Sequence, residues 1–420
     1  MSLLALIKQP RTLNEIDLDN ELLLDLVLKH LYDGGVMNTS QLVERLGLAG
    51  GIVESLLDLL RNDFKVEVLA ANHSSNQLRY QLTIIGQVEA RNAYLRSGYS
   101  GRVPISLTHY RALVEAQSVF NNSVTREQLQ SVFSDVVLED AIVNQLGPAL
   151  NSGRAIMVYG PAGSGKTFIC QHLVACLGEP VHLPYALVVG REIIQFFDPV
   201  LHIPVYSLVE KADYQFVNQT DQRLILCKRP IAISGGELTM DSLELSYDSV
   251  TRFSQAPIQL KANNGIYIVD DMGRQRVPTV DLLNRWIVPM AEHLDYLTLG
   301  SGQHFPVPFN IILIFSTNIN PYDLADAAFL RRLGYKIKFT SITKEAYQQL
   351  WGIICLSRSL KLEDGLLEQV FEWYENTKRP FYPCQPLDLL SIGHDFAIFN
   401  HKDYLSKVDM KLAWNTYFID

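Results

Sequence analysis

One stretch of eight residues limits the folds open to this chain more than any other feature. The apolar run at residues 155–159 leads directly into residues 160–167, and the letters that follow, FICQHLVACL, have the spacing of a helix. A strand, a glycine-rich loop and a helix in this order form the phosphate-binding P-loop of α/β proteins. The alternative is a chance glycine-rich turn. Such a turn would not require the P-loop residue at every fixed position of the pattern, whereas this sequence has all of them.

Each position of this loop has a physical role. Its residues are Gly160, Pro161, Ala162, Gly163, Ser164, Gly165, Lys166 and Thr167. Gly163 and Gly165 let backbone N–H groups turn toward phosphate oxygens, and the start of the helix adds partial positive charge. We expect Lys166 to reach the β- and γ-phosphates of ATP, and the Thr167 hydroxyl to bind Mg²⁺. All eight residues are therefore predicted to bind nucleotide.

Polar side chains follow two later apolar strands. Asp270 and Asp271 come directly after residues 266–269, and Asn318 follows residues 311–317. In a P-loop enzyme the first carboxylate would hold the Mg²⁺ shell and the second would polarise the attacking water. Two acids after a strand can also cap a helix, and an asparagine at a strand end can belong to a turn. The order along the chain favours catalytic roles, with Asn318 orienting the water.

Composition limits the remaining function classes. The 420 residues, 48% hydrophobic and 19% charged, allow two or three globular domains. The net charge of −9 disfavours a general coating of nucleic acid. Five scattered cysteines fit a reducing compartment better than a zinc site or a disulfide framework. The longest apolar runs have the length of strands, so we expect no membrane insertion and a cytoplasmic location.

The chain divides into four segments. Residues 1–100 give three helices and two strands around a polar turn at residues 72–76, which resembles a winged helix. Its third helix offers Glu54, Asp58 and Arg61, so a protein contact is favoured over DNA reading. Residues 101–127 are expected to form a helical linker, residues 128–341 an α/β domain with an insertion near 200–260, and residues 342–420 a helical lid.

The combined motifs resemble the AAA+ family of ATPases. This resemblance covers residues 125–400 and includes the segment that ends in Arg331 and Arg332. It implies a parallel sheet flanked by helices, ATP and Mg²⁺ as cofactors, and a homo-oligomeric ring, expected as a hexamer. It also implies that Arg331 or Arg332 is an arginine finger that reaches the neighbouring subunit's nucleotide; the alternative is a solvated helix end. Which arginine acts is left open.

Two further features concern the branch of the family and its pore. The strand pair expected around residues 300–302 is similar to the extra hairpin of the MoxR and magnesium-chelatase-like branch. Tyr185, Phe196 and Phe197 are candidates either for a pore loop or for the core.

Two residues depart from the family pattern. Asp271 stands where a glutamate is usual, which places its carboxylate about one methylene farther from the water. Leu387 stands where the lid of the family has an arginine, and Arg379 is a substitute candidate.

The leading hypothesis from the sequence is a ring ATPase that remodels or assembles a protein client, recruited by the first 100 residues. A nucleotide-gated scaffold with little turnover is the second hypothesis. An ATP-dependent DNA-binding regulator is the third, supported by Arg79, Arg91, Arg96 and Arg102. The client and the biological process are not encoded in these motifs.

Overall fold

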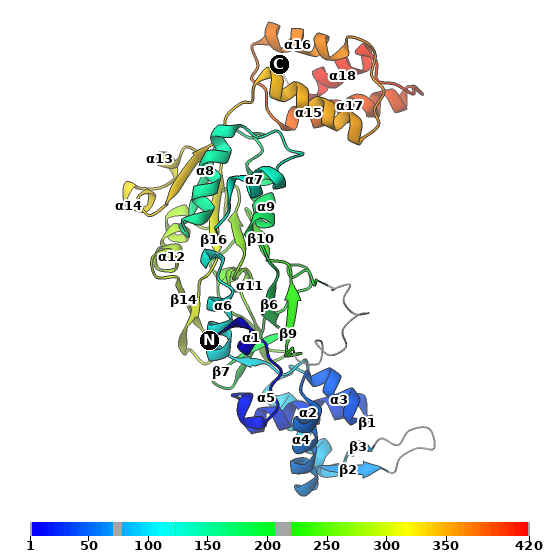
Figure 1. The fold of residues 1–420 in the computed structure, drawn as a ribbon, viewed down its shortest axis with the longest axis vertical. Coiled ribbons are helices and arrows are strands. Elements are labelled where there is room, and N and C mark those ends of the chain that lie inside the picture. Colours follow the sequence, from blue (N-terminus) through cyan, green and yellow to red (C-terminus); the bar gives the residue numbers. More distant parts are fainter. Residues whose placement is uncertain (1, 70–77, 122, 206–219, 419–420) are drawn as a thin grey trace.

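The computed structural model describes residues 2–69, 78–121, 123–205 and 220–418. Figure 1 shows an elongated molecule with the C-terminal helices at one end, a mixed helix and strand region in the middle, and most of the first 100 residues at the other end. The turn predicted at residues 72–76 and part of the predicted insertion lie outside the described residues.

A five-stranded parallel sheet, called the central sheet here, carries the predicted motifs. Its strand order is β10-β13-β16-β5-β17, and every neighbouring pair is parallel. The strands are β10 (Ile231–Ser234), β13 (Ile266–Val269), β16 (Ile312–Thr317), β5 (Ile156–Tyr159) and β17 (Tyr335–Lys338). The predicted α/β fold is confirmed, and three predicted apolar strands are β5, β13 and β16.

Helices cover both faces of the central sheet, which explains why its three inner strands, β13, β16 and β5, are continuous apolar runs. Ile156 and Val158 pack with α8 and α9, whereas Met157 faces α12 and α14 on the other side. The helices around the sheet are α7 (Arg126–Val132), α8 (Asp140–Asn151), α9 (Lys166–His172), α11 (Ile258–Lys261), α12 (Thr279–Glu292), α13 (Pro321–Leu324) and α14 (Ala327–Leu330). Polar residues at the carboxyl ends of β5, β13 and β16 therefore meet at one edge.

A second five-stranded sheet lies between the central sheet and the N-terminal region. Its order is β11-β12-β8-β7-β4. The strands are β4 (Ile105–Ser106), β7 (Ala186–Val189), β8 (Glu192–Gln195), β11 (Ser246–Asp248) and β12 (Phe253–Gln255), with the separate pair β6 (Val181–Pro184) and β9 (Leu224–Cys227). Residues 101–127, predicted as a linker, include β4 and the helix α6 (Leu107–Ala116), and β4 pairs with β7. The predicted linker segment thus contributes an edge strand to this sheet.

The hairpin of β14 (Leu294–Thr298) and β15 (His304–Pro308) forms as predicted and is antiparallel. The backbone N–H groups of Gly300 and Ser301 at its tip donate to the Glu192 carboxylate of β8, each over 3.1 Å. The core alternative is confirmed for Phe196, which is fully buried and stacks on His202. Phe197 and Tyr185 pack against each other.

The described residues among the first 100, apart from α1 (Leu3–Leu6) and η1 (Leu13–Glu15), form what we call the N-terminal module. It contains α2 (Asn20–Gly34), α3 (Thr39–Leu46), α4 (Gly50–Asn62), α5 (Ile84–Arg96), β1 (Met37–Asn38), β2 (Val66–Leu69) and β3 (Arg79–Leu82). Local signals set these limits: Asn38 and Gln41 cap α3 reciprocally, and Gly47 ends it in the left-handed region. The strand order is β1-β3-β2.

A buried ion pair lies where the N-terminal module meets the body of the molecule. Asp221 and Arg223 are almost completely buried and are 2.7 Å apart. The backbone of Gln222 between them accepts from Arg102 and donates to Gln9. This ion pair therefore organises a turn that both regions contact.

We predict that Asp221→Ala lowers the free energy of unfolding by about 3–5 kcal/mol, because it leaves the buried Arg223 guanidinium uncompensated. Urea unfolding followed by circular dichroism would measure the change. Asp140→Ala is the matched control, since the Asp140–Arg126 pair is exposed and should contribute little. Equal effects of both substitutions would contradict this role of the buried pair.

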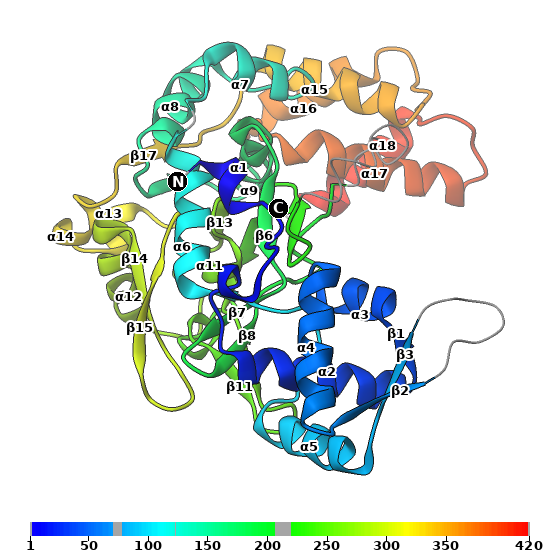
Figure 2. The same ribbon diagram turned by 60° about the horizontal axis from the view of Figure 1, so that its bottom comes forward.

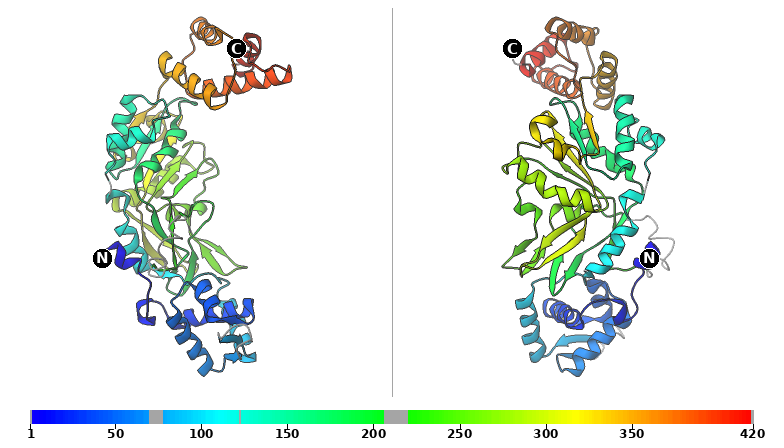
Figure 3. Two further views of the ribbon diagram at one scale, coloured as in Figure 1. Left: turned by 45° about the vertical axis from the view of Figure 1, so that its right-hand side comes forward. Right: turned by 90° about the vertical axis from the view of Figure 1, so that its left-hand side faces the viewer.

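Four helices form the C-terminal lid: α15 (Lys344–Ser357), α16 (Leu366–Thr377), α17 (Cys384–Phe399) and α18 (Lys407–Tyr417). Their core is aromatic, with Tyr347, Trp351, Tyr374 and Trp414 buried together. Figure 3 shows this lid at the opposite end of the molecule from the N-terminal module. Within the described ranges, none of the helices combines the length and hydropathy needed to span a bilayer.

Candidate nucleotide site

The P-loop connects β5 to α9, and its glycines are required by close neighbours. Gly160 has φ 145°, and a Cβ there would lie 2.1 Å from the Phe339 carbonyl oxygen. Gly163 has φ 79°, and a Cβ there would lie 2.4 Å from the Cys384 sulfur of the lid. A larger residue at Gly160 would push the loop away from Phe339, which follows β17. A larger residue at Gly163 would be strained by the positive φ and would displace the Cys384 side chain. The tight loop therefore keeps its backbone N–H groups beside the cavity.

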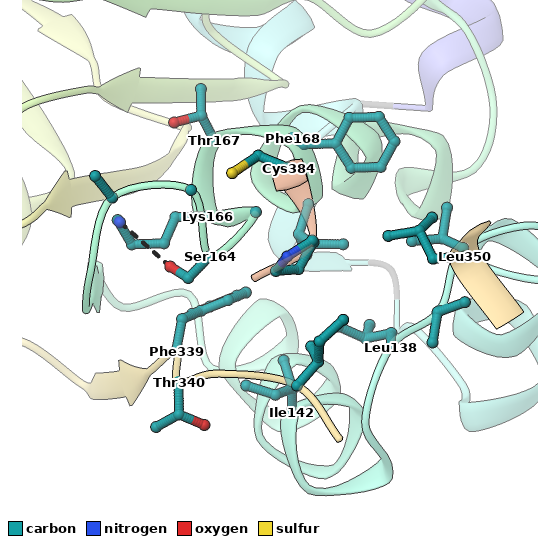
Figure 4. Close-up of a pocket in the computed structure, with 18 of the residues that line it drawn as sticks. Leu138, Ile142, Ser164, Lys166, Thr167, Phe168, Phe339, Thr340, Leu350 and Cys384 are labelled. Atoms are coloured by element: carbon teal, nitrogen blue, oxygen red, sulfur yellow. Dashed lines mark hydrogen bonds between the residues drawn. The ribbon is translucent and has the colours of Figure 1, made fainter. Parts of the chain in front are cut away.

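Lys166 lies at the centre of the site. Its ammonium donates to the carbonyls of Gly160 and Pro161 over 3.0 and 2.8 Å, and to Asn318 Oδ1 over 2.8 Å. Burial lowers the pKa of Lys166, while Asp270 and Asp271 partly oppose that shift. Figure 4 shows this side chain beneath the loop, directed toward Ser164. An incoming phosphate oxygen would replace one of these neutral oxygens as a hydrogen-bond acceptor of the Lys166 ammonium.

Thr167 and Asp270 form the second contact across the site. The Thr167 hydroxyl donates to Asp270 Oδ2 over 2.9 Å. A hydroxyl and a carboxylate are hard oxygen ligands of the kind that Mg²⁺ binds together with waters and phosphate oxygens. The donor set at this point therefore fits a magnesium ion.

Asn318 joins Lys166 to Asp271. Its Oδ1 accepts from Lys166, and its Nδ2 donates to Asp271 Oδ1 over 3.0 Å. Asp271 itself has φ 48°, in the left-handed region, and its N–H donates to Asp270 Oδ1 over 2.9 Å. The predicted residues from three separate strand ends thus form one connected polar group.

This group borders a cavity of about 590 Å³. The end away from the phosphate loop is apolar, with Leu138, Ile142 and Leu350 in its wall. Among the described residues that line it, Lys166 is the one cation, beside the carboxylates of Glu139, Asp270 and Asp271. A triphosphate bound here would need further positive charge from outside these side chains.

Arg331 and Arg332 lie outside this cavity. Both are exposed, and they lie between α14 and β17. The first residue of β17, Tyr335, pairs with Ile156 at the start of β5. The P-loop follows the other end of β5, so the arginines and this chain's own phosphate loop lie toward opposite ends of that strand. Arg332 Nη1 donates back to the Ala328 carbonyl over 2.7 Å, whereas the Arg331 side chain has no partner among the described residues.

The lid contacts the loop through the start of α17. The Cys384 N–H donates to the Gly163 carbonyl over 3.3 Å, and Pro383, Cys384 and Leu387 line the cavity. The guanidinium of Arg379 lies 4.5 Å from the centre of the Phe418 ring, and Arg379 is not among the lining residues. Arg379 is therefore engaged inside the lid, and the cavity wall presents Leu387 where the family resemblance predicts a cation.

The sequence alone did not identify Gln275, which supports the Asp270–Asp271 turn. Its side-chain nitrogen donates to the carbonyls of Asp270 over 3.0 Å and of Asp271 over 3.4 Å, and its oxygen accepts from the Gly273 N–H over 2.8 Å. These bonds hold Asp271 in its left-handed conformation. A glutamine four to five residues after an acidic pair gives no specific sequence signal. Gln275 is a positioning residue of this turn.

We predict that Gln275→Glu lowers kcat of nucleotide hydrolysis about tenfold and leaves KM nearly unchanged, because a misplaced Asp271 affects the reacting water more than nucleotide binding. The carboxylate would keep the acceptor for Gly273 but repel the two carbonyls. Below about pH 5 its protonated form can donate again, so the ratio of variant to wild-type kcat should rise as the pH falls. A ratio that does not change between pH 7 and pH 4 would contradict this role.

The fold and the loop together define an α/β P-loop protein. Comparisons with known proteins add little beyond that class. A model described as a domain of unknown function (DUF8689) matches residues 343–416, which are the lid helices. No curated protein matches the chain.

Solved structures show a distant likeness. A RuvB mutant from Thermotoga maritima is 12% identical over 67% of this chain and 71% of that chain, with a TM-score of 0.38. The Thermotoga maritima RuvB Holliday junction branch migration motor is 12% identical over 72% and 74%, with a TM-score of 0.36. NtrX from Brucella abortus is 12% identical over 56% and 46%, with a TM-score of 0.35. TM-scores this low transfer no function, so the fold assignment rests on the chain's own sheet and loop.

Proposed function

We propose that this chain is a magnesium-dependent ATPase of the AAA+ type that acts as a ring and remodels or assembles a protein client. The connected group of Lys166, Asn318 and Asp271, beside the Thr167–Asp270 pair, is the observation that supports it most. These are the groups that phosphoryl transfer to water needs, at hydrogen-bond distance from one another. The further resemblance to the MoxR-like branch stays a prediction.

Each side chain of the site would have a separate role in hydrolysis. Loop N–H groups and Lys166 would hold the β- and γ-phosphates, and the apolar end of the cavity would take the base. Thr167 and Asp270 would hold Mg²⁺, which supplies charge to the phosphate oxygens. Asn318 would fix Asp271 through one carboxylate oxygen, so that the other can accept a proton from the attacking water. The new P–O bond then forms as the bond to ADP breaks.

The charge of the site supports a ring. The lining side chains supply one ammonium against three carboxylates, and charge stabilisation of the transferring phosphoryl group needs more cations than that. Arg331 is exposed and without a side-chain partner among the described residues, remote from its own loop, so it is the better candidate to reach a neighbour's nucleotide. The number of subunits, expected as six, stays a prediction.

One observation favours a second function, a nucleotide-gated scaffold with little turnover. Among the described residues, the lid wall of the cavity offers Pro383, Cys384 and Leu387 to the nucleotide and no cation, so closing the lid would not stabilise the transferring phosphate. The DNA-binding alternative has less support, because Arg96 is paired with Asp25 and Glu89, and Arg61 is paired with Asp58.

Steady-state ATP hydrolysis measured against protein concentration tests the proposal. Turnover per chain that requires Mg²⁺ and rises with concentration is the expected result, because the site is completed by a neighbour. Tight Mg·ATP binding without turnover at any concentration would leave the scaffold function. Absence of both binding and turnover would overturn the proposed nucleotide site itself.

A further inference from the structure

Helix α5 of the N-terminal module is amphipathic, but it turns small residues toward the module and large aliphatic residues toward solvent. The face that packs against α2 and the Lys65 carbonyl carries small residues, Gly86, Ala90 and Ala93, all buried. The opposite face carries large aliphatic residues that are exposed: Ile84 by 82%, Val88 by 53% and Leu95 by 60%. A helix of a globular domain normally turns such residues inward. The inverted arrangement leaves an apolar face to be covered.

The exposed residues form a continuous stripe. Positions 84, 88, 91 and 95 follow a spacing of four, three and four residues, which places them within about 60° around the helix. The stripe is about 16 Å long. Ile85 and Phe64, exposed by 59% and 75%, extend it at the start of the helix, where the Thr83 hydroxyl donates to the Phe64 carbonyl. Figure 2 shows α5 at the lower outer edge of the module.

The positive charge of Arg91 limits which kind of partner can cover this stripe. The Arg91 Nε donates to the Tyr32 hydroxyl over 3.1 Å, and its guanidinium carbon lies 5.9 Å from the centre of the Tyr32 ring. Among the described residues, the guanidinium has no carboxylate partner. Two α5 helices from copies of this chain would bring both Arg91 guanidiniums into one apolar seam, side by side in a parallel pair and about one turn apart in an antiparallel pair. Like charges in such a seam are unfavourable. A partner with a carboxylate at this position would instead form an ion pair.

We infer that the stripe of Ile84, Val88, Arg91 and Leu95 is a docking surface for an amphipathic helix of another protein, about three turns long, with a carboxylate facing Arg91. The four-three-four spacing is that of a helix–helix seam, and the length matches such a segment. The inference rests on the proposed recruitment of a protein by this module but not on ATP turnover. Binding can therefore be tested without nucleotide, so the two proposals can fail separately.

The probe is a pair of synthetic amphipathic helical peptides with leucines at seam spacing and either glutamate or lysine at the position facing Arg91. Fluorescence anisotropy against the full chain should give tighter binding of the glutamate peptide, by about threefold to fivefold. The Arg91→Glu variant should reverse this preference. Val88→Asp should weaken binding about 30-fold or more, whereas Val408→Asp, at an exposed valine of α18, should have no effect.

Four results would overturn the inference. The first three are undetectable binding of both peptides at about 1 mM, equal binding that Arg91→Glu does not change, and concentration-dependent self-association that Val88→Asp abolishes. Binding of phosphatidylcholine and phosphatidylglycerol vesicles, lost in Val88→Asp, would likewise assign the stripe to a lipid surface. Circular dichroism would compare the helix content and melting temperature of Val88→Asp with those of the wild type. Equal values would show that a loss of binding is not caused by a loss of folding.

Discussion

Lys166→Ala is expected to lower the rate of ATP hydrolysis by about 10²- to 10³-fold, the loss that follows removal of one charge-stabilising donor at a transferring group. The side chain bonds to two loop carbonyls and to Asn318, so its removal also frees the amide that orients Asp271. Single-turnover hydrolysis with nucleotide in excess of its Kd would measure the chemical step apart from binding.

Two controls sharpen this result. Lys166→Arg keeps the charge but not the length, and a planar guanidinium cannot occupy the position between the Gly160 and Pro161 carbonyls that the compact ammonium fills. It should therefore recover little activity. Lys361→Ala, at an exposed lysine between α15 and α16, should leave the rate unchanged. A rate for Lys166→Ala within threefold of wild type would remove Lys166 from the mechanism.

The second large effect concerns the arginines. The double variant Arg331→Ala plus Arg332→Ala is expected to lower hydrolysis by about 10³-fold or more, the range measured for arginine fingers, while ATP binding changes little. Because Arg332 is tied back to Ala328, Arg331→Ala alone should account for most of the loss.

Mixing two inactive variants tests whether the site is shared. Lys166→Ala has a defective loop and intact arginines, and the double arginine variant has the reverse. In a mixed ring, some interfaces would combine an intact loop with an intact arginine, so activity should reappear on mixing. If each chain used its own arginines, the mixture would be as inactive as its components.

The central sheet and its polar edge were predictable because local signals define them. The P-loop pattern is a short contiguous motif, and β5, β13 and β16 are apolar runs that two covered faces require. Parallel strands bring their carboxyl ends to one edge, so Lys166, Asp270, Asp271 and Asn318 could be grouped from strand ends alone. Their individual bonds follow from that placement.

The second sheet could not be predicted in this way. Its strands have two to four residues, and β4 pairs with β7, some eighty positions later in the chain. Short strands give little periodicity, and such distant pairing is set by tertiary packing. For the same reason, the contact of Cys384 with Gly163 and the support that Gln275 gives to Asp271 depend on a turn and a lid position that no local pattern specifies.

The Asp270–Asp271 turn and the hairpin of β14 and β15 are connected through α12. From the turn the chain enters α12, and Arg285 on that helix is bonded to the buried Asp295 at the start of the hairpin over 2.6 Å. The hairpin tip is fixed to Glu192 of the second sheet by two N–H groups. If a bound γ-phosphate displaces the turn, the displacement would therefore reach the second sheet through α12 and the hairpin. The N-terminal module packs against this second sheet.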